Sequence, residues 1–497
     1  MKIAFRLARQ SRHPLAVMVS ILLALALPIS VLANVAVTQI SSDPYTNIDS
    51  QHATQVEPDS FAYGNTIVTA VQTGRFYNGG ASNICWSTST NAGASWTNGC
   101  LPGLTNNAPP GGGTFDRVSD PVVAYDARHN VWMISTLPLI GRSSTVAPTA
   151  AGVYTSRSTD GGLTWGNPIL VTGSNQQSPD KNWIVCDNTA TSPFYGNCYT
   201  EWDANGDGNR IYMSTSTDGG LTWGARMRTA NSATGIGGQP LVQPNGTVIV
   251  PIDSGNETAL LAFNSTNGGT SWSATTTITT ISTHTVAGGL RTGPLPSAEI
   301  DAAGKVYVVW QDCRFRRGCK VNDLVMTTST NGTTWTPVVR IPIDSTGSNV
   351  DHFIPGLAVD GTTSGGTAKL ALAYYYYPKA NCGSSCQLTV GYISSVNGGG
   401  AWTAATQLAG PMSLTWIADT SQGRMVGDYI STSYSGGTAH PVFTLATAPS
   451  GSTFHEALFT PSAGLSSGAA VVTAGADQPV PGAASDHAAP QSPIVQR

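Results

Sequence analysis

The sequence predicts an all-β protein built from a repeated unit. Charged residues make up 10% of the 497-residue chain, well below the roughly 25% of an ordinary soluble domain. Its 55 glycines, together with 12 Trp, 16 Tyr and 11 Phe, are typical of many short strands joined by tight turns. A short motif that ends in Trp also recurs along the chain. A net charge of −4 and the scarcity of charge disfavour nucleic-acid-binding proteins and helical bundles.

Residues 1–33 are typical of a secretory signal peptide. Four basic residues lie between positions 2 and 12, an apolar stretch covers 15–27, and a cleavage site follows near 31–33. The apolar stretch is shorter than the roughly 20 residues of a spanning helix. We therefore expect a secreted protein with no membrane span after cleavage. Its net charge would be 20 − 28 = −8, because the four removed charges are all positive.

One motif, S-x-[DN]-x-G-x-[ST]-W, organises the rest of the chain. The copy at 329–335 is one residue shorter, and the copy at 395–402 is degraded. Asp or Asn accepts backbone N–H bonds in a turn, Gly adopts the positive φ that closes a hairpin, and Trp buries a large apolar face. The six copies occupy residues 89–96, 158–165, 216–223, 265–272, 329–335 and 395–402.

The motif resembles the Asp-box, or BNR repeat, of sialidases and related β-propellers. The resemblance extends over about residues 57–460. It implies a sialidase-like β-propeller in which the box is a structural turn with no catalytic role. The box indicates the fold more than the activity, because sialidases, sortilin-type receptors, glycan lyases and non-catalytic binding propellers all carry it.

Counting the repeated units predicts seven blades within residues 34–462. Residues 35–40 would supply the strand that closes the ring, and the seventh unit has strands but no box. The sialidase family has six blades, so a six-bladed ring is the alternative. Residues 463–497 are rich in Ala, Gly, Ser and Pro and predict a disordered tail. The units begin near residues 57, 120, 180, 239, 295, 353 and 425.

Eight cysteines follow the signal peptide, and an even number in a secreted chain predicts disulfides. Sequence alone does not define the connectivity, but pairing between neighbours is the simplest arrangement. A zinc site is disfavoured because no histidine lies at zinc-like spacing. The neighbouring pairs are Cys85 and Cys100, Cys186 and Cys198, Cys313 and Cys319, and Cys382 and Cys386.

The scarce charges gather in the segments that a propeller places on the face opposite the boxes. Arg75 and Arg314 occupy similar segments, Gln-Thr-Gly-Arg and Gln-Asp-Cys-Arg. A repeated arginine suggests recognition of a carboxylate or another anion. In the alternative interpretation, each arginine pairs with a neighbouring aspartate and stiffens its loop. The predicted substrate-binding residues are Glu57, Arg75, Arg117, Lys181, Arg291, Arg314, His352 and Arg424.

The resemblance to sialidases also implies catalytic roles. That family binds the substrate carboxylate with three arginines and uses an Asp as acid/base and a Tyr–Glu pair as nucleophile. Here Asp120 or Asp180 would be the acid/base, and the nearest candidates for the nucleophilic pair are Tyr429 beside Asp428 and Tyr199 with Glu201. The sequence departs from the family because its first unit has no Arg-Ile-Pro motif and no Tyr–Glu pair is evident.

One loop resembles part of a calcium site. Asp203, Asn205 and Asp207 match the first half of D-x-[DN]-x-[DN]-G. The twelfth position is Ser214, so the bidentate glutamate is missing. A structural Ca²⁺ and a plain polar hairpin are the two alternatives, and no other cofactor is expected to be required.

The sequence therefore predicts a secreted sialidase-like glycoside hydrolase that acts on acidic sugars at the axial face. A non-catalytic propeller that binds a glycan or a protein is the alternative. A polysaccharide lyase with His352 or a tyrosine as base is a third interpretation. The expected ligand is an acidic carbohydrate rather than nucleic acid, and the expected state is a monomer.

Overall fold

The computed structural model describes residues 35–143, 145–174, 177–468, 472–473, 477–480 and 485–486. The predicted signal peptide lies outside these residues. The all-β class is confirmed, because the named strands pair antiparallel throughout and the helical segments among the described residues are short 3₁₀ turns. In the described part of the chain, no helix combines the length and apolar character needed to cross a membrane.

Hydrogen bonding arranges the described strands in seven successive four-stranded groups. A single bridge between Ala81 and Val118 joins the first two groups into one larger sheet. The groups are β2 (Gln55–Tyr63), β3 (Thr66–Arg75), β4 (Ala81–Ser89) and β5 (Thr97–Cys100); β6 (Arg117–Asp126), β7 (Val131–Ile140), β9 (Gly152–Ser158) and β10 (Ile169–Gly173); β11 (Pro179–Cys186), β12 (Cys198–Ala204), β13 (Arg210–Ser216) and β14 (Met227–Arg228); β16 (Leu241–Val242), β17 (Val248–Ser254), β18 (Ala259–Ser265) and β19 (Thr276–Thr280); β20 (Ser297–Ile300), β21 (Val306–Asp312), β22 (Asp323–Ser329) and β23 (Val339–Arg340); β24 (Asp351–Val359), β25 (Leu370–Tyr377), β26 (Gln387–Ser395) and β28 (Thr406–Ser413); and β31 (Ser431–Ser435), β32 (Thr438–Ser450), β33 (Thr453–Pro461) and β1 (Val37–Gln39).

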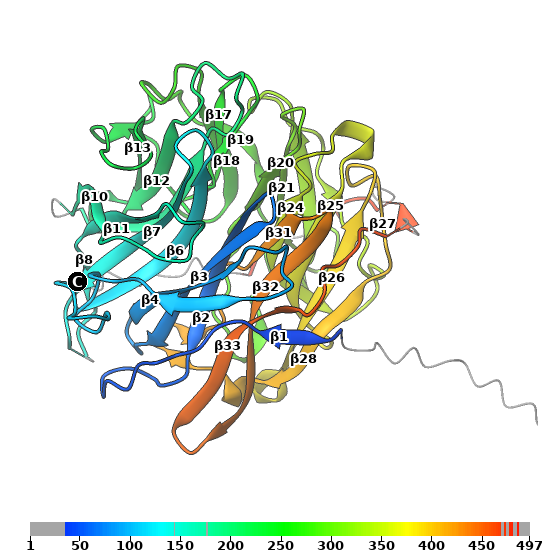
Figure 1. Ribbon diagram of the computed structural model, residues 1–497. Helices are drawn as coiled ribbons and strands as arrows, with labels where there is room; N and C mark the ends of the chain where they lie inside the picture. The colour runs from blue at the N-terminus through cyan, green and yellow to red at the C-terminus, as the bar shows by residue number, and fades with distance from the viewer. Residues whose placement is uncertain are drawn as a thin grey trace, which may run out of the picture. The chain divides into compact units, whose positions relative to one another are not determined.

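The innermost strands of these groups contact one another in a closed cycle, in the order β2, β6, β11, β16, β20, β24, β31 and back to β2. β1, near the start of the described chain, pairs with β33, and the two lie side by side in Figure 1. A strand from one terminus thus completes a group built from the other terminus, which removes an open edge. This arrangement is a β-propeller.

Apolar cores fill the spaces between neighbouring groups. Trp272, from the box of the fourth group, packs edge-on against Phe263 and against Tyr199 of the third group. Trp402 is fully buried in a cluster with Tyr307 and Leu372, which come from the fifth and sixth groups. The predicted role of the motif Trp as a buried face between strands is thus confirmed at these two copies.

The box turns are built as their residue types require. In the second copy, Asp160 Oδ1 accepts the backbone N–H of Thr164 at 2.9 Å and of Leu163 at 3.1 Å. The Ser158 hydroxyl donates to Asp160 at 2.8 Å and accepts the N–H of Gly162 at 2.9 Å. Gly162 has φ of 82°, a conformation that other residues rarely adopt.

Four local disulfides confirm the predicted pairing: Cys85–Cys100, Cys186–Cys198, Cys313–Cys319 and Cys382–Cys386. The first two join residues that face each other on adjacent strands, so they bridge strands rather than close a single loop.

Parts of the expected disordered tail are ordered where the structure describes them. β34 (Val472–Thr473) pairs with β27 (Ala401–Trp402), and Leu465 exchanges backbone hydrogen bonds with Ala439. These described residues of the tail thus form backbone hydrogen bonds with the blades. The physical reason is that short strands in the blades offer unpaired N–H and C=O groups to which the tail can bond.

Candidate functional site: a charged pocket at the propeller axis

Four inner strands carry a β-bulge at the place where the sequence predicts the start of a unit, and on three of them the bulge holds a charged residue. The pairing register shifts next to Glu57 on β2, Asp120 on β6 and Lys181 on β11. These three residues have φ of 57°, 48° and 48°. A bulge turns a side chain away from the alternation of the strand, and such strained residues cluster at functional sites. The bulges aim these three side chains toward one centre.

Lys181 is the centre of this cluster. Its ammonium lies 3.5 Å from a carboxylate oxygen of Glu57 and 4.0 Å from one of Asp120, and it forms an ion pair with Asp428. Asp428 forms a second ion pair with Arg291. These side chains are 10% exposed or less. Burial lowers the pKa of Lys181, but Asp120, Asp428 and Glu57 outweigh that effect and raise it well above its ordinary value, so Lys181 is a permanent cation.

Asp120 and Asp180 lie on either side of one backbone N–H. The amide nitrogen of Lys181 is 3.2 Å from Asp120 Oδ2 and 3.0 Å from Asp180 Oδ1. The Ser119 hydroxyl donates to Asp120 at 2.7 Å, and Asn205 donates to Asp180 at 2.9 Å. Burial, and then the neighbouring Asp120, raises the pKa of Asp180 to about 6. The two predicted acid/base candidates are therefore brought together.

Arg75 reaches the same centre from β3. Its Nη1 donates to the carbonyl oxygen of Gly80 at 2.6 Å, and its Nε is buried without a hydrogen-bond partner among the described residues. Burial, and then the nearby Arg291, lowers the pKa of Arg75 to about 10. A buried guanidinium with an unused donor is suited to binding an anion that enters the pocket.

These residues line a pocket of about 290 Å³, open mouth included. Three basic and three acidic side chains meet there: Arg75, Lys181, Arg291, Glu57, Asp120 and Asp180. They come from the first three groups of strands and from the loop that precedes β20. In a chain with only 10% charged residues, such convergence makes this pocket the candidate functional site.

A second pocket of about 380 Å³ adjoins the first and shares Lys181 with it. Its wall is mainly apolar and includes Trp183, Leu295, Pro296 and Tyr429. Trp183 and Tyr429 meet edge to face, with ring centroids 5.3 Å apart. The two pockets together offer a charged compartment beside an aromatic one.

Two carboxyl groups at this centre differ sharply in proton affinity. Burial raises the pKa of Glu57 to about 8, although Lys181 opposes this effect. Asp428 is also buried, but Arg291 and Lys181 hold its pKa below the usual range. One group thus keeps a proton near neutral pH and the other is ionised, a pairing that suits acid and base roles.

The environment of Tyr429 does not favour the phenolate. Its hydroxyl donates to the carbonyl oxygen of Pro121 at 3.2 Å, and burial together with Glu57 and Asp120 raises its pKa well above the ordinary value. Tyr429 lies beside Asp428, as the sequence predicts, yet it faces the aromatic pocket.

Four of the predicted binding residues lie outside the lining of the charged pocket. Arg117 bonds to Asn78, Gly79 and Ser143, while Arg314 pairs with Asp312 at 2.6 Å, so the loop-stiffening alternative holds for Arg314. The Arg424 guanidinium donates to the carbonyl oxygen of Ile417 at 2.6 Å. His352 is buried in another cluster, described next. The four residues are Arg117, Arg314, His352 and Arg424.

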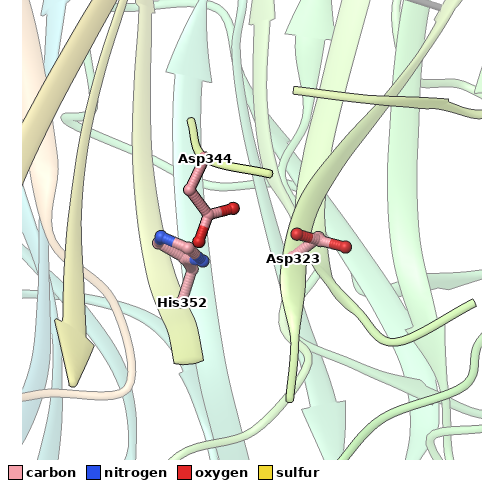
Figure 2. Close-up of side chains that lie close together, drawn as sticks. All are labelled: Asp323, Asp344 and His352. Carbon is pink, nitrogen blue, oxygen red and sulfur yellow. The ribbon is translucent and has the colours of Figure 1, made fainter. Parts of the chain in front are cut away.

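His352 lies with Asp323 and Asp344, and the potential ligand atoms of the three are within 4.8 Å of one another (Figure 2). Arg316 pairs with Asp323 at 2.5 Å and with Asp344 at 2.7 Å, and Arg340 pairs with Asp323 at 2.8 Å. These guanidinium groups already balance the carboxylates. The cluster is therefore an ion network that joins β22, β23 and β24 rather than an open set of metal ligands.

The three residues of the calcium-like loop have different partners. Asp203 is fully buried and faces Asp180 across the β11–β12 pair, whereas Asn205 donates to Asp180. Asp207 pairs with Arg210 at 3.0 Å and accepts the Tyr212 hydroxyl at 2.8 Å. Asp207 therefore forms a local ion pair with Arg210, whereas Asp203 and Asn205 lie beside Asp180.

The sequence-based reasoning missed two residues of the site. Gln72 donates to the Glu57 carboxylate, and Trp183 forms a wall of the aromatic pocket. The segment that carries Gln72 also carries Arg75, and Trp183 follows Lys181 by two positions on the same inner strand. Their closeness in the sequence to Arg75 and Lys181 could have pointed to them. Their contacts with residues on other strands could not be deduced from the sequence.

Comparisons with known proteins agree with the repeat. Residues 152–356 match the family model for a BNR repeat-like domain, and no curated protein matches the chain. A protein of unknown function from Dyadobacter fermentans is similar in structure, with 15% identity, a TM-score of 0.46 and coverage of 73% of this chain and 99% of its own. A leech intramolecular trans-sialidase has 13% identity, a TM-score of 0.45 and coverage of 68% and 67%.

A polysaccharide lyase, described as an ulvan lyase, has 9% identity, a TM-score of 0.47 and coverage of 83% of this chain and 94% of its own. At such identities and scores, these structures assign no residue role to this chain. The chain therefore contains a BNR repeat-like domain at residues 152–356, and its six box turns lie on a closed ring of strands, which is the architecture of a β-propeller.

Proposed function

We propose that the protein is a glycoside hydrolase that acts on acidic sugars, of the exo-sialidase type, in the charged axial pocket. The observation that carries the proposal is the convergence of three basic and three acidic side chains in one cavity. Glycoside hydrolysis needs a proton donor and a second carboxylate near the bond that breaks. An acidic sugar also needs cations that bind its carboxylate.

The residues of the pocket supply each of these parts. Arg75 and Arg291 would bind the sugar carboxylate, and Lys181 would hold the surrounding carboxylates in place. Asp120 and Asp180 remain the acid/base candidates, and Tyr429 with Asp428 remains the candidate for the nucleophile. The aromatic pocket would receive the remainder of the substrate, because sugar rings pack their C–H faces on aromatic side chains.

The test is hydrolysis of a fluorogenic sialoside by the purified protein without its signal peptide. We expect turnover by the wild type and a loss of about 100-fold or more in Asp120→Asn, because hydrolysis needs more than one carboxyl group at the bond that breaks. Arg75→Lys should raise KM, since a single ammonium replaces the guanidinium fork. Arg142→Gln is the matched control, because that arginine is 70% exposed and pairs with Asp116 outside the pocket.

A binding propeller without catalysis is the second candidate. One observation favours it, because Lys181 and Arg291 already have Asp428 as an ionic partner. Retained binding on a glycan array without release of sugar would support this candidate and contradict the hydrolase. Products with the near-ultraviolet absorbance of unsaturated uronates would instead indicate a lyase.

Secretion forms part of the proposal. Four disulfides are typical of an oxidising compartment, and the leader sequence is the feature that predicts export. The protein should therefore be recovered from the medium of an expressing host with residue 34 or a close neighbour at its N-terminus, which N-terminal sequencing would check.

A further inference from the structure

We propose that Glu57 is the proton donor of the axial pocket and delivers its proton to the oxygen of the leaving group. The inference rests on the proposed function. It gives Glu57 the role that the resemblance to sialidases assigns to Asp120 or Asp180.

The backbone presents Glu57 to the pocket. Glu57 sits on the bulge of β2 with φ of 57°, its side chain is 1% exposed, and it lines the charged pocket. The residue after it is Pro58, which has no N–H to pair in the strand. The carboxyl group is therefore held at the cavity wall by a feature of the main chain rather than by a flexible loop.

The two cations near Glu57 form their ion pairs with another carboxylate, that of Asp428. Both Lys181 and Arg291 contact Asp428, whereas Lys181 reaches Glu57 at 3.5 Å. The other donors to Glu57 are the side-chain amide of Gln72 and, at 3.4 Å, the backbone N–H of Asp428. Of the two carboxyl groups, Glu57 and Asp428, Glu57 thus has the weaker ion pairing with Lys181 and Arg291. Glu57 is therefore the one of the two that retains a proton.

Gln72 supplies an acceptor for that proton. Its Oε1 is buried and has no hydrogen-bond partner among the described residues, while its Nε2 contacts Glu57. The two ends of an amide are assigned from the hydrogen bonds around them. With the amide turned over, a protonated Glu57 would donate its O–H to Gln72 Oε1, and the orphaned acceptor would be satisfied.

The electrostatics agree with this geometry. Burial raises the pKa of Glu57 to about 8 against the opposing effect of Lys181, and Asp120 and Asp428 raise it further. The other charged or titratable groups that face Glu57 are Arg75, Arg291 and Tyr429. The pKa of Glu57 is therefore higher than that of Asp180, which lines the same pocket and has a pKa of about 6.

The proposed step transfers one proton from Glu57 to the leaving oxygen. As the bond between the anomeric carbon and the leaving oxygen breaks, its electron pair stays on that oxygen, which takes the proton from Glu57. The resulting carboxylate is stabilised by the Lys181 ammonium 3.5 Å away. Water supplies the hydroxyl group that ends on the anomeric carbon, and its remaining proton returns to Glu57. The sum is hydrolysis of one glycosidic bond by one water.

Leaving-group dependence tests the assignment. A substrate that needs protonation, such as an alkyl glycoside of an acidic sugar, should react about 100-fold or more slowly with Glu57→Gln, whereas an activated aryl glycoside should lose less than about 10-fold. Asp120→Asn and Asp180→Asn should slow both substrates by similar factors. If Asp120→Asn or Asp180→Asn shows the strong leaving-group dependence and Glu57→Gln does not, the proposal is wrong.

A second readout does not depend on turnover. Infrared titration between about pH 6 and pH 10 should show protonated-carboxyl absorbance that is lost around the pKa of about 8. Glu57→Gln should remove the Glu57 part of this absorbance and leave that of Glu299, whose pKa burial also raises to about 8. Asp180→Asn should keep the Glu57 absorbance, and thermal melting would show that each variant folds. Absorbance unchanged in Glu57→Gln overturns the proposal at any activity. A wild type with the Glu57 absorbance but without hydrolysis overturns the proposed function instead.

Discussion

Arg117 is fully buried although no carboxylate forms an ion pair with it among the described residues. Its guanidinium donates to Asn78 Oδ1 at 2.5 Å, to the Gly79 carbonyl oxygen at 3.0 Å and to the Ser143 carbonyl oxygen at 2.8 Å, and it lies 4.2 Å from the centre of the Phe76 ring. It therefore joins two loops, one of which supplies Gly79 to the wall of the charged pocket. At the scale of the residue, the hydrogen-bond partners of a buried arginine thus indicate whether it is available to bind a ligand or supports neighbouring loops.

Arg117→Gln should destabilise the protein by about 2–4 kcal/mol, because three buried acceptors lose their donor. Urea unfolding followed by tryptophan fluorescence would measure the change. The exposed Arg142→Gln is the control and should leave the unfolding midpoint almost unchanged, since Arg142 pairs with Asp116 at the surface, where an ion pair adds little stability. Equal effects of the two substitutions would contradict the assigned role of Arg117.

At the scale of the element, the box turn and the β-bulge have different roles: the box stabilises a turn, and the bulge orients a side chain. The box satisfies its own backbone groups through short-range bonds, so six copies can be built from one pattern of seven or eight residues. The bulge instead turns individual side chains toward the axis, and the residue there varies between Glu57, Asp120, Lys181 and Ile354. The repeated element thus supports the fold, and the variable position within each inner strand carries the chemistry.

The box can be tested with one position and two substitutions. Asp160→Ala removes the acceptor of two backbone N–H groups and of the Thr164 hydroxyl, which lies at 2.6 Å. It should lower stability by about 1 kcal/mol, the typical value for the loss of such a cap. Asp160→Asn should cost less, because Asn91 and Asn267 already build the same turn with an amide. Thermal unfolding of the two variants would separate these outcomes, and the reverse order would contradict the assigned bonds.

At the scale of the whole molecule, ring closure concentrates acids that a single blade would keep apart. Burial at the axis raises the pKa of Glu57 to about 8, of Asp59 to about 7 and of Asp180 to about 6. The native protein therefore holds protons there that the unfolded chain, with ordinary carboxyl pKa values near 4, has released. The stability from these groups is fully present in acid below those ordinary values and is lost as the pH rises through about 6 to 8.

The melting temperature should accordingly be lower at about pH 9 than at about pH 6. Glu57→Gln should reduce this difference, because the amide does not titrate, whereas Asp49→Asn at the exposed surface should leave it unchanged. Calorimetry at constant ionic strength would measure both effects. A melting temperature that rises between these pH values, or that responds equally to the two substitutions, would contradict the proposed protonation of the axis.

Much of the fold can be predicted from the sequence because it depends on residues that are close together in the chain. The box lies within eight residues, and the disulfide partners are at most 15 positions apart. The starts of the units at Glu57, Asp120 and Asp180 could be placed for the same reason, since each follows a short, recognisable pattern. Arg314 was harder to interpret, because its segment resembles that of Arg75 while its partner Asp312 lies only two residues away.

The sequence by itself determined the all-β class, the box turns, the disulfide pairs and a set of charged residues on one face. Only the tertiary structure decided which of those charges meet, because Lys181 and Asp428 are 247 positions apart and become neighbours when the ring closes. It also separated Glu57 from Asp428 in proton affinity. That difference arises from burial and from shared cations, which are properties of the assembled axis and of no single segment.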